Sequence, residues 1–106
     1  MKHEKLAVIF FVEDGEVFAA FPSITAATLH PAICLCYSHT GQHGGVYVGY
    51  LKRGRILHAQ PDEYADLLRE LRKIYEEDGA YELVVRSRLK GNYHRARVAA
   101  LRRYLS

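Results

Sequence analysis

The sequence lacks any apolar stretch long enough to cross a bilayer, which needs about 20 residues. Near the N-terminus, the apolar residues 6–12 are followed at once by Glu13 and Asp14. A basic start before such a run resembles the front of a signal peptide, but no small-residue cleavage pattern follows it at the right place. We therefore interpret the run as a buried strand, and we expect a cytoplasmic protein that does not contact a membrane.

Cysteine is also scarce, because the chain holds only Cys34 and Cys36. Two cysteines separated by one residue on a strand do not reach the geometry of a disulfide, so we expect both thiols to be reduced, as in a cytosolic protein. The chain has 106 residues, of which 49% are hydrophobic. This is enough for one domain with its own core. Folding therefore requires no disulfide and no metal, and we predict no required cofactor.

Acidic residues are absent from the last part of the chain, residues 83–106. The same part holds seven of the basic residues, namely Arg86, Arg88, Lys90, Arg95, Arg97, Arg102 and Arg103. The remaining residues hold 8 Lys and Arg against all 12 Asp and Glu, so a mildly acidic body carries a basic C-terminal end. Such asymmetry is typical of a surface for nucleic acid or another polyanion, and equally of a solvated helix face.

Strand and helix patterns are present along the whole chain. Asp14 and Gly15 separate two apolar runs and predict a β-hairpin with a type I′ turn, and Pro22 is expected to end its second strand. An amphipathic stripe and an N-terminal proline predict a helix over 61–77. The other predicted elements are strands at 32–37, 46–51, 55–59 and 81–86, a turn at 52–54, and a helix at 93–105 with its apolar stripe on His94, Val98, Leu101 and Leu105.

This order of elements favours an α+β fold. We expect a small, mainly antiparallel sheet, made of the N-terminal hairpin and further strands, packed by one central helix and a C-terminal helix. A single domain spans residues 1–106. Within it, residues 1–88 form the core, and residues 89–106 form a basic helical extension.

The segment CLCYSHTGQHGG, residues 34–45, is the densest in residues capable of chemistry. Strand alternation places Ile33, Leu35 and Tyr37 on one face and the two cysteines on the other. Three glycines exclude a stable helix from residues 38–45, which we therefore interpret as a polar loop.

Four interpretations of this segment and of the basic end stay open. Zinc accepts thiolates and imidazoles, and the candidate ligands are Cys34, Cys36, His39 and His43, although their spacing lacks the usual paired knuckles. A Cys34 thiol activated by His39 or His43 would make a hydrolase or transferase. The cysteines could instead fill the core while His39 and Gln42 satisfy the loop backbone. Lastly, the basic C-terminal end could contact phosphates.

The chain also resembles a known pattern. The segments at 14–22, 34–45 and 61–88 are similar to those of a family of small uncharacterised bacterial and phage-encoded proteins with a C-x-x-Y-x-H-x-G-Q-H motif. The matching positions are Asp14, Gly15, Phe21, Pro22, Cys34, Tyr37, His39, Gly41, Gln42, His43, Glu63, Tyr64, Leu67, Glu70 and Leu71. Cys36 and the helix after Asn92 depart from the pattern. The resemblance implies that the loop at residues 38–45 has a function, but it does not indicate which activity the protein has.

From these observations we predict a binding or accessory module that uses the loop and the basic C-terminal surface. The predicted binding residues are Tyr37, His39, Gln42, His43, Arg86, Arg88 and Arg95. The alternatives are a Cys–His enzyme centred on Cys34 and a zinc-binding protein. Nucleic acid or another polyanion is the expected partner, and the edge strands of so small a sheet leave a homodimer open.

Overall fold

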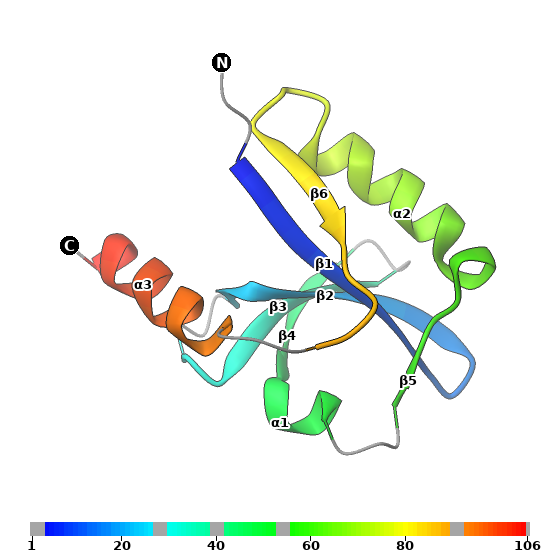
Figure 1. Cartoon of the computed structure of the whole chain (residues 1–106), viewed down its shortest axis with the longest axis horizontal. Helices are drawn as coiled ribbons and strands as arrows, with labels where there is room; N and C mark the ends of the chain where they lie inside the picture. The colour runs from blue at the N-terminus through cyan, green and yellow to red at the C-terminus, as the bar shows by residue number, and fades with distance from the viewer. Residues whose placement is uncertain (1–3, 27–29, 39–41, 53–55, 90–92, 106) are drawn as a thin grey trace.

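The computed structural model describes residues 4–26, 30–38, 42–52, 56–89 and 93–105 (Figure 1). Within these residues, six strands form one sheet accompanied by three helices, which confirms the predicted α+β class. The strands are β1 (Glu4–Glu13), β2 (Glu16–Thr25), β3 (Ile33–Ser38), β4 (His43–Tyr47), β5 (Leu57–His58) and β6 (Tyr81–Val85). The helices are α1 (Val48–Leu51), α2 (Pro61–Tyr75) and α3 (Tyr93–Leu105).

The sheet is mainly antiparallel and runs in the order β4-β3-β2-β1-β5. β6 also pairs with β1, in parallel. The Arg86 amide donates to the Val8 carbonyl and the Ala59 amide donates to the Phe10 carbonyl, so the ends of β6 and β5 lie on the same side of β1. One edge of the sheet is therefore β4, and the other is divided between two short strands.

The N-terminal hairpin forms as predicted. Asp14 and Gly15 have φ angles of 51° and 81°, the positive values that a type I′ turn requires. The prediction that Pro22 ends the second strand is wrong, because β2 continues to Thr25. Its register with β3 shifts between Phe21 and Thr25, and such a bulge accommodates a residue that lacks a backbone N–H.

The second predicted hairpin, from 46–51 and 55–59, is also wrong. Residues 48–51 form α1, and β5 pairs with β1 instead of β4. The predicted loop over 38–45 is wrong from His43 onward, where β4 begins. Its Gly45 lies so close to β3 that a Cβ there would be 2.7 Å from Ile33 Cγ2 and 2.8 Å from Ala26 Cβ. This close approach requires a glycine within a strand.

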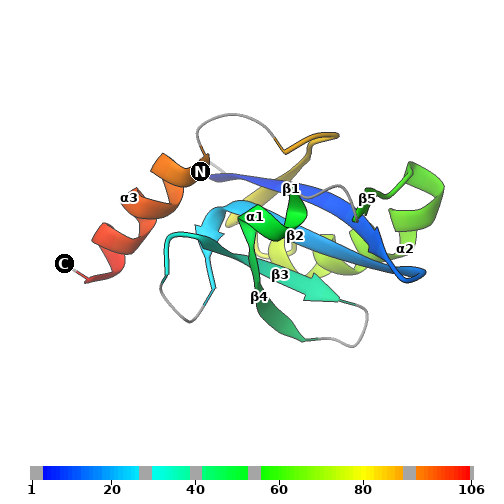
Figure 2. The same ribbon diagram turned by 90° about the horizontal axis from the view of Figure 1, so that it is seen from below.

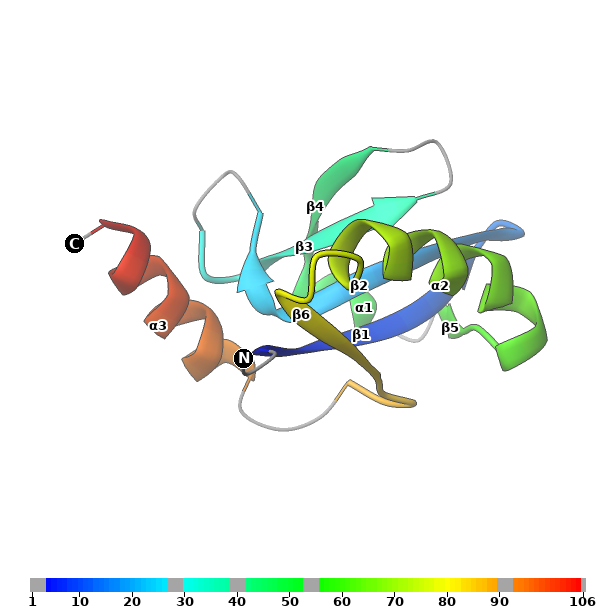
Figure 3. The same cartoon turned by 90° about the horizontal axis from the view of Figure 1, so that it is seen from above.

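The two faces of the sheet are covered differently, as the opposite views of Figures 2 and 3 show. On one face α2 buries Leu67 and Leu71 against Val8, Phe10 and Phe21. On the other face the four-residue α1 buries Val48 and Leu51 with Ile9, Phe11 and Cys34. None of the helices in the described part of the chain is long and apolar enough to cross a membrane.

Helix α3 packs against β2 through a buried arginine. Arg97 is only 3% exposed, and its guanidinium donates from Nε to the Pro31 carbonyl and from Nη1 to the Pro22 carbonyl, each at 2.6 Å. The predicted apolar stripe is therefore wrong at His94 and Leu105, which are exposed, and right at Leu101. The face of α3 that packs against the sheet is the one that carries Arg97, because this side chain donates hydrogen bonds to the Pro22 and Pro31 carbonyls.

Candidate functional site

The two cysteines lie on one face of the sheet, as strand alternation predicts. Cys34 is completely buried, and burial raises its pKa to about 11, although the nearby Arg97 charge acts in the opposite direction. Cys36 is partly buried, and burial likewise raises its pKa. Both thiols are therefore protonated near neutral pH, unlike the thiolate that acts as a nucleophile.

His43 lies on the opposite face from these cysteines. It is the cross-strand partner of Tyr37, whereas Cys36 is paired with Gly44 and Cys34 with Val46. Directly paired residues of neighbouring strands share a face, so the sheet itself separates the thiols from the imidazole. Among the described residues, no group of three or more His, Cys, Asp or Glu is arranged to hold a metal ion. His39 lies outside the described residues.

On the α2 face, Tyr37 and His43 belong to an aromatic and polar network. His43 Nε2 lies 2.7 Å from the Tyr75 hydroxyl, and the Tyr37 and His43 rings are 4.7 Å apart. Burial and the neighbouring Tyr81 and Tyr37 raise the pKa of Tyr75 to about 12. The network thus ties the edge strand β4 to α2.

Glu70 of α2 completes this network, and the sequence interpretation did not include it among the binding residues. Burial, the charge of Glu70 and a hydrogen bond with its side chain raise the pKa of Tyr37. The Oε2 atom of Glu70 is buried and has no hydrogen-bond partner among the described residues. The resemblance had already placed Glu70 in the same pattern as Tyr37 and His43, and this was the signal that could have identified it.

A hollow of about 350 Å³ lies beside β4 on the cysteine face. Glu13 and Glu16 supply its carboxylates, and the Tyr50 hydroxyl donates a hydrogen bond to Glu13 Oε2. Gln42 also lines it, so this predicted binding residue lies here. On the cysteine face the remaining lining is Phe18, Cys36, Ser38, Gly44 and Val46, and Tyr37, His43 and Gly45 line it from the other face of β3 and β4. We refer to this feature as the acidic hollow.

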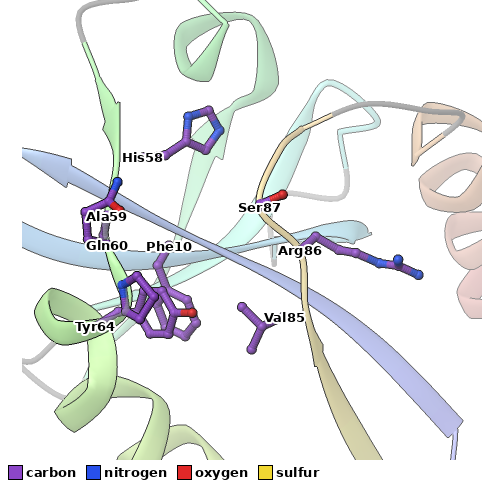
Figure 4. A pocket seen from close by; sticks show the side chains of 9 residues that line it. Phe10, His58, Ala59, Gln60, Tyr64, Val85, Arg86 and Ser87 are labelled. Carbon is purple, nitrogen blue, oxygen red and sulfur yellow. The ribbon is translucent and has the colours of Figure 1, made fainter.

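Arg86 lies at a second hollow, of about 370 Å³, at the opposite edge of the sheet (Figure 4). One side is formed by His58, Gln60 and Tyr64, and the other by Val85, Arg86 and Ser87, with Phe10 of β1 between them. The Tyr64 ring stacks on Phe10 with centroids 4.3 Å apart. The Arg86 side chain extends away from these rings, so its guanidinium reaches beyond the rim (Figure 4).

Arg88 lines a third hollow, of about 540 Å³, next to the second. His58 contributes to both, and Lys52, Leu57 and Leu89 line the third. Every charged residue that lines these two hollows in the described part of the chain is cationic: Lys52, Arg86 and Arg88. We refer to these three residues and His58 as the basic edge.

The predicted binding residues therefore do not form one site. Tyr37, Gln42 and His43 all line the acidic hollow, and Tyr37 and His43 also belong to the network under α2. Arg86 and Arg88 lie at the basic edge. Arg95 is exposed on α3 and lines neither hollow of that edge. Lys52 and His58 were not predicted, because only the fold brings them beside Arg86 and Arg88, which are distant in the sequence.

Comparison with known proteins identifies no matching family model, no similar curated protein and no similar solved structure. The functional argument therefore rests on the chemistry of these surfaces.

Proposed function

We propose that the protein binds single-stranded nucleic acid at the basic edge. The observation that carries the proposal is the pair of adjoining hollows that share His58. Their charged lining residues, as far as the structure describes them, are all cations. Lys52, His58, Arg86 and Arg88 are all exposed and so are accessible to phosphates. Phosphate contacts require such a cationic surface and supply most of the sequence-independent affinity.

The hollow under Tyr64 favours a single strand over a duplex. Its volume of about 370 Å³ falls in the range of ligand pockets, and its wall combines the Tyr64 ring with the Gln60 amide and the Ser87 hydroxyl. An unpaired base can place its face against an aromatic ring and its edge against such polar groups, whereas a base inside a duplex cannot. Because the Arg86 side chain points away from the hollow, it would contact a phosphate of the strand outside the hollow (Figure 4).

The test is fluorescence anisotropy with a labelled single strand of about 12 nucleotides, as RNA and as DNA, and with the corresponding duplex. Salt is varied between about 50 and 200 mM. Three cations that contact phosphates predict a slope of log K against log salt of about −2 for a single strand. We expect the duplex to bind more weakly than either single strand.

The decisive variant is the double substitution Arg86→Gln and Arg88→Gln, with Arg95→Gln as its matched control. The double variant should lose about tenfold in affinity, and its salt slope should shrink to about −0.7. Arg95→Gln removes an equally exposed arginine from α3 and should leave both quantities unchanged. Equal losses in the two proteins would place the interaction elsewhere and contradict the proposal.

A further inference from the structure

The other edge of the sheet, β4, has a backbone that a further strand can pair with. The Ser38 amide donates to the Gln42 carbonyl, which fixes the alternation of the β3–β4 ladder. The amides and carbonyls of His43 and Gly45 and the amide of Tyr47 consequently point away from β3, toward the open edge. Among the described residues no strand pairs with β4 on that side, and Figures 2 and 3 show β4 at the margin of the sheet.

The sequence of β4 has few of the features that protect an edge strand from pairing. Its residues HGGVY include no lysine, no proline and no acidic residue. Natural edge strands are commonly protected by such residues, by bulges, or by a covering helix or loop. β4 pairs with β3 at all five of its residues without a register shift, so its outer edge is a regular extended backbone.

The acidic hollow opens beside this edge. Gly44 has no side chain on the cysteine face, and a Cβ there would meet only Cys36 Sγ, at 3.6 Å. A residue paired with Gly44 on an added strand would share its face and project over this gap. The hollow that it meets contains the carboxylates of Glu13 and Glu16 and the ring of Phe18. These groups fit a long cationic side chain, because the carboxylates neutralise it and the ring contacts its stem.

We propose that an extended segment of a partner protein adds to the edge of β4 and places a Lys or Arg side chain in the acidic hollow. This mode of binding takes affinity from main-chain hydrogen bonds and specificity from a pocket for one side chain. A second copy of β4 is a poorer occupant, because β4 has no Lys or Arg to place in the hollow. The inference is independent of nucleic-acid binding, which concerns the opposite edge.

The test uses the capped peptide Thr-Val-Thr-Lys-Thr-Val-Thr and the same peptide with norleucine in place of lysine. Each is titrated into the isotope-labelled full chain, and amide chemical shifts are followed. The proposal predicts saturable shifts at His43, Gly45, Tyr47 and Glu16 with the lysine peptide, and binding weaker by about threefold or more with norleucine. Shifts confined to the basic edge, equal affinity for the two peptides, or no shift with either would overturn it.

Tyr47 offers a matched pair of variants. Its φ of −66° is the value that proline adopts, and its N–H points to the open edge, so Tyr47→Pro removes that donor without disturbing the β3–β4 ladder. Tyr47→Ala removes the same ring and keeps the donor. We expect Tyr47→Pro to lose at least tenfold more affinity for the lysine peptide than Tyr47→Ala. Equal affinities would overturn strand addition.

The variant Glu16→Gln is the alternative test if Tyr47→Pro fails to fold. It removes one carboxylate from the hollow and should weaken the lysine peptide about threefold while leaving the norleucine peptide unchanged. Light scattering of the free protein completes the test. A monomer supports an edge that is open to a partner, whereas a dimer with protected amides at Gly45 and Tyr47 would assign the edge to a second copy and overturn the proposal.

Discussion

The two edges of the sheet differ in both backbone and charge. The β4 edge is one regular strand of five residues beside a hollow with two carboxylates. The opposite edge is divided between β5 and β6, and the gap between them leaves hollows whose charged residues are cations. The comparison teaches that the hollows of this small fold lie where its edge strands end. The positions of these strand ends matter more for ligand binding than any single sequence motif.

Helix α1 separates the two kinds of hollow on one face of the sheet. Tyr50 lines the acidic hollow, whereas the next two residues, Leu51 and Lys52, line a basic one. One turn of helix thus divides surfaces of opposite charge, and each can be altered without the other. The predictions below use this separation.

The largest effect is expected from the arginine that belongs to neither edge. Arg97→Met would leave the carbonyls of Pro22 and Pro31 without their donor, and we expect a loss of about 3 kcal/mol in the free energy of unfolding. Denaturant unfolding measures this loss. The exposed Arg95→Met is the control and should stay within about 0.5 kcal/mol of the parent. Similar stabilities in the two variants would refute the supporting role of Arg97.

The adjacent glycines of β4 provide the next test. A Cβ at Gly45 would clash with Ile33 and Ala26, whereas one at Gly44 would make an ordinary contact with Cys36. We expect Gly45→Ala to lower the free energy of unfolding by about 2 kcal/mol and Gly44→Ala to change it by less than about 0.5 kcal/mol. If Gly44→Ala destabilises as much as Gly45→Ala, the described register of β4 is incorrect.

Alkaline pH tests the buried groups between the edges. The pKa of Cys34 is raised to about 11 from 9.0, so the unfolded chain loses this proton first as the pH rises. The contribution of the buried, protonated Cys34 thiol to the free energy of unfolding is therefore fully present below pH 9.0. It is lost as the pH rises from 9.0 to about 11. We expect Cys34→Ala to reduce this decline by an amount on the order of 1 kcal/mol in unfolding experiments across that range. An unchanged pH profile would indicate that the thiol is not buried.

The smallest effect concerns cysteine reactivity. Cys36 lines the acidic hollow and Cys34 is buried, so iodoacetamide should modify Cys36 several-fold faster at the same pH. The lysine peptide should slow the modification of Cys36, and an oligonucleotide should leave it unchanged. If the oligonucleotide also slowed the modification of Cys36, the two edges would belong to one binding site, and the separation described above would be wrong. Mass spectrometry of the digested protein distinguishes the two cysteines.

Much of the fold could be predicted because local chemistry determines it. The Asp14–Gly15 turn requires positive φ values, and the α2 sequence supplies Pro61, a capping box from Gln60 and Glu63, and an apolar stripe. Even in α2 one large apolar side chain, that of Ile74, is 45% exposed. The features predicted incorrectly are β4, α1 and the pairing partner of β5. These elements are short, and their form depends on contacts with β3 and β1 that are distant in the sequence.

The candidate sites were less predictable for the same reason. Arg86 and Arg88 could be identified from the charge pattern, but their neighbours Lys52 and His58 come from another part of the chain. Glu13 and Glu16 were not among the predicted site residues, yet they supply the carboxylates of the acidic hollow. The described cysteines and His43 of the dense segment lie on opposite faces of the sheet, which no spacing argument resolves without the partner strands.

The most direct test of the central claim is amide chemical-shift mapping of the labelled full chain with a single-stranded oligonucleotide at low salt. The basic edge predicts the largest shifts at Lys52, His58, Arg86, Ser87 and Arg88, which diminish as salt is added. Amides of β4 and α3 should remain unchanged. Largest shifts on α3 around Arg95, or no shifts at low salt, would contradict the assignment of nucleic-acid binding to this edge.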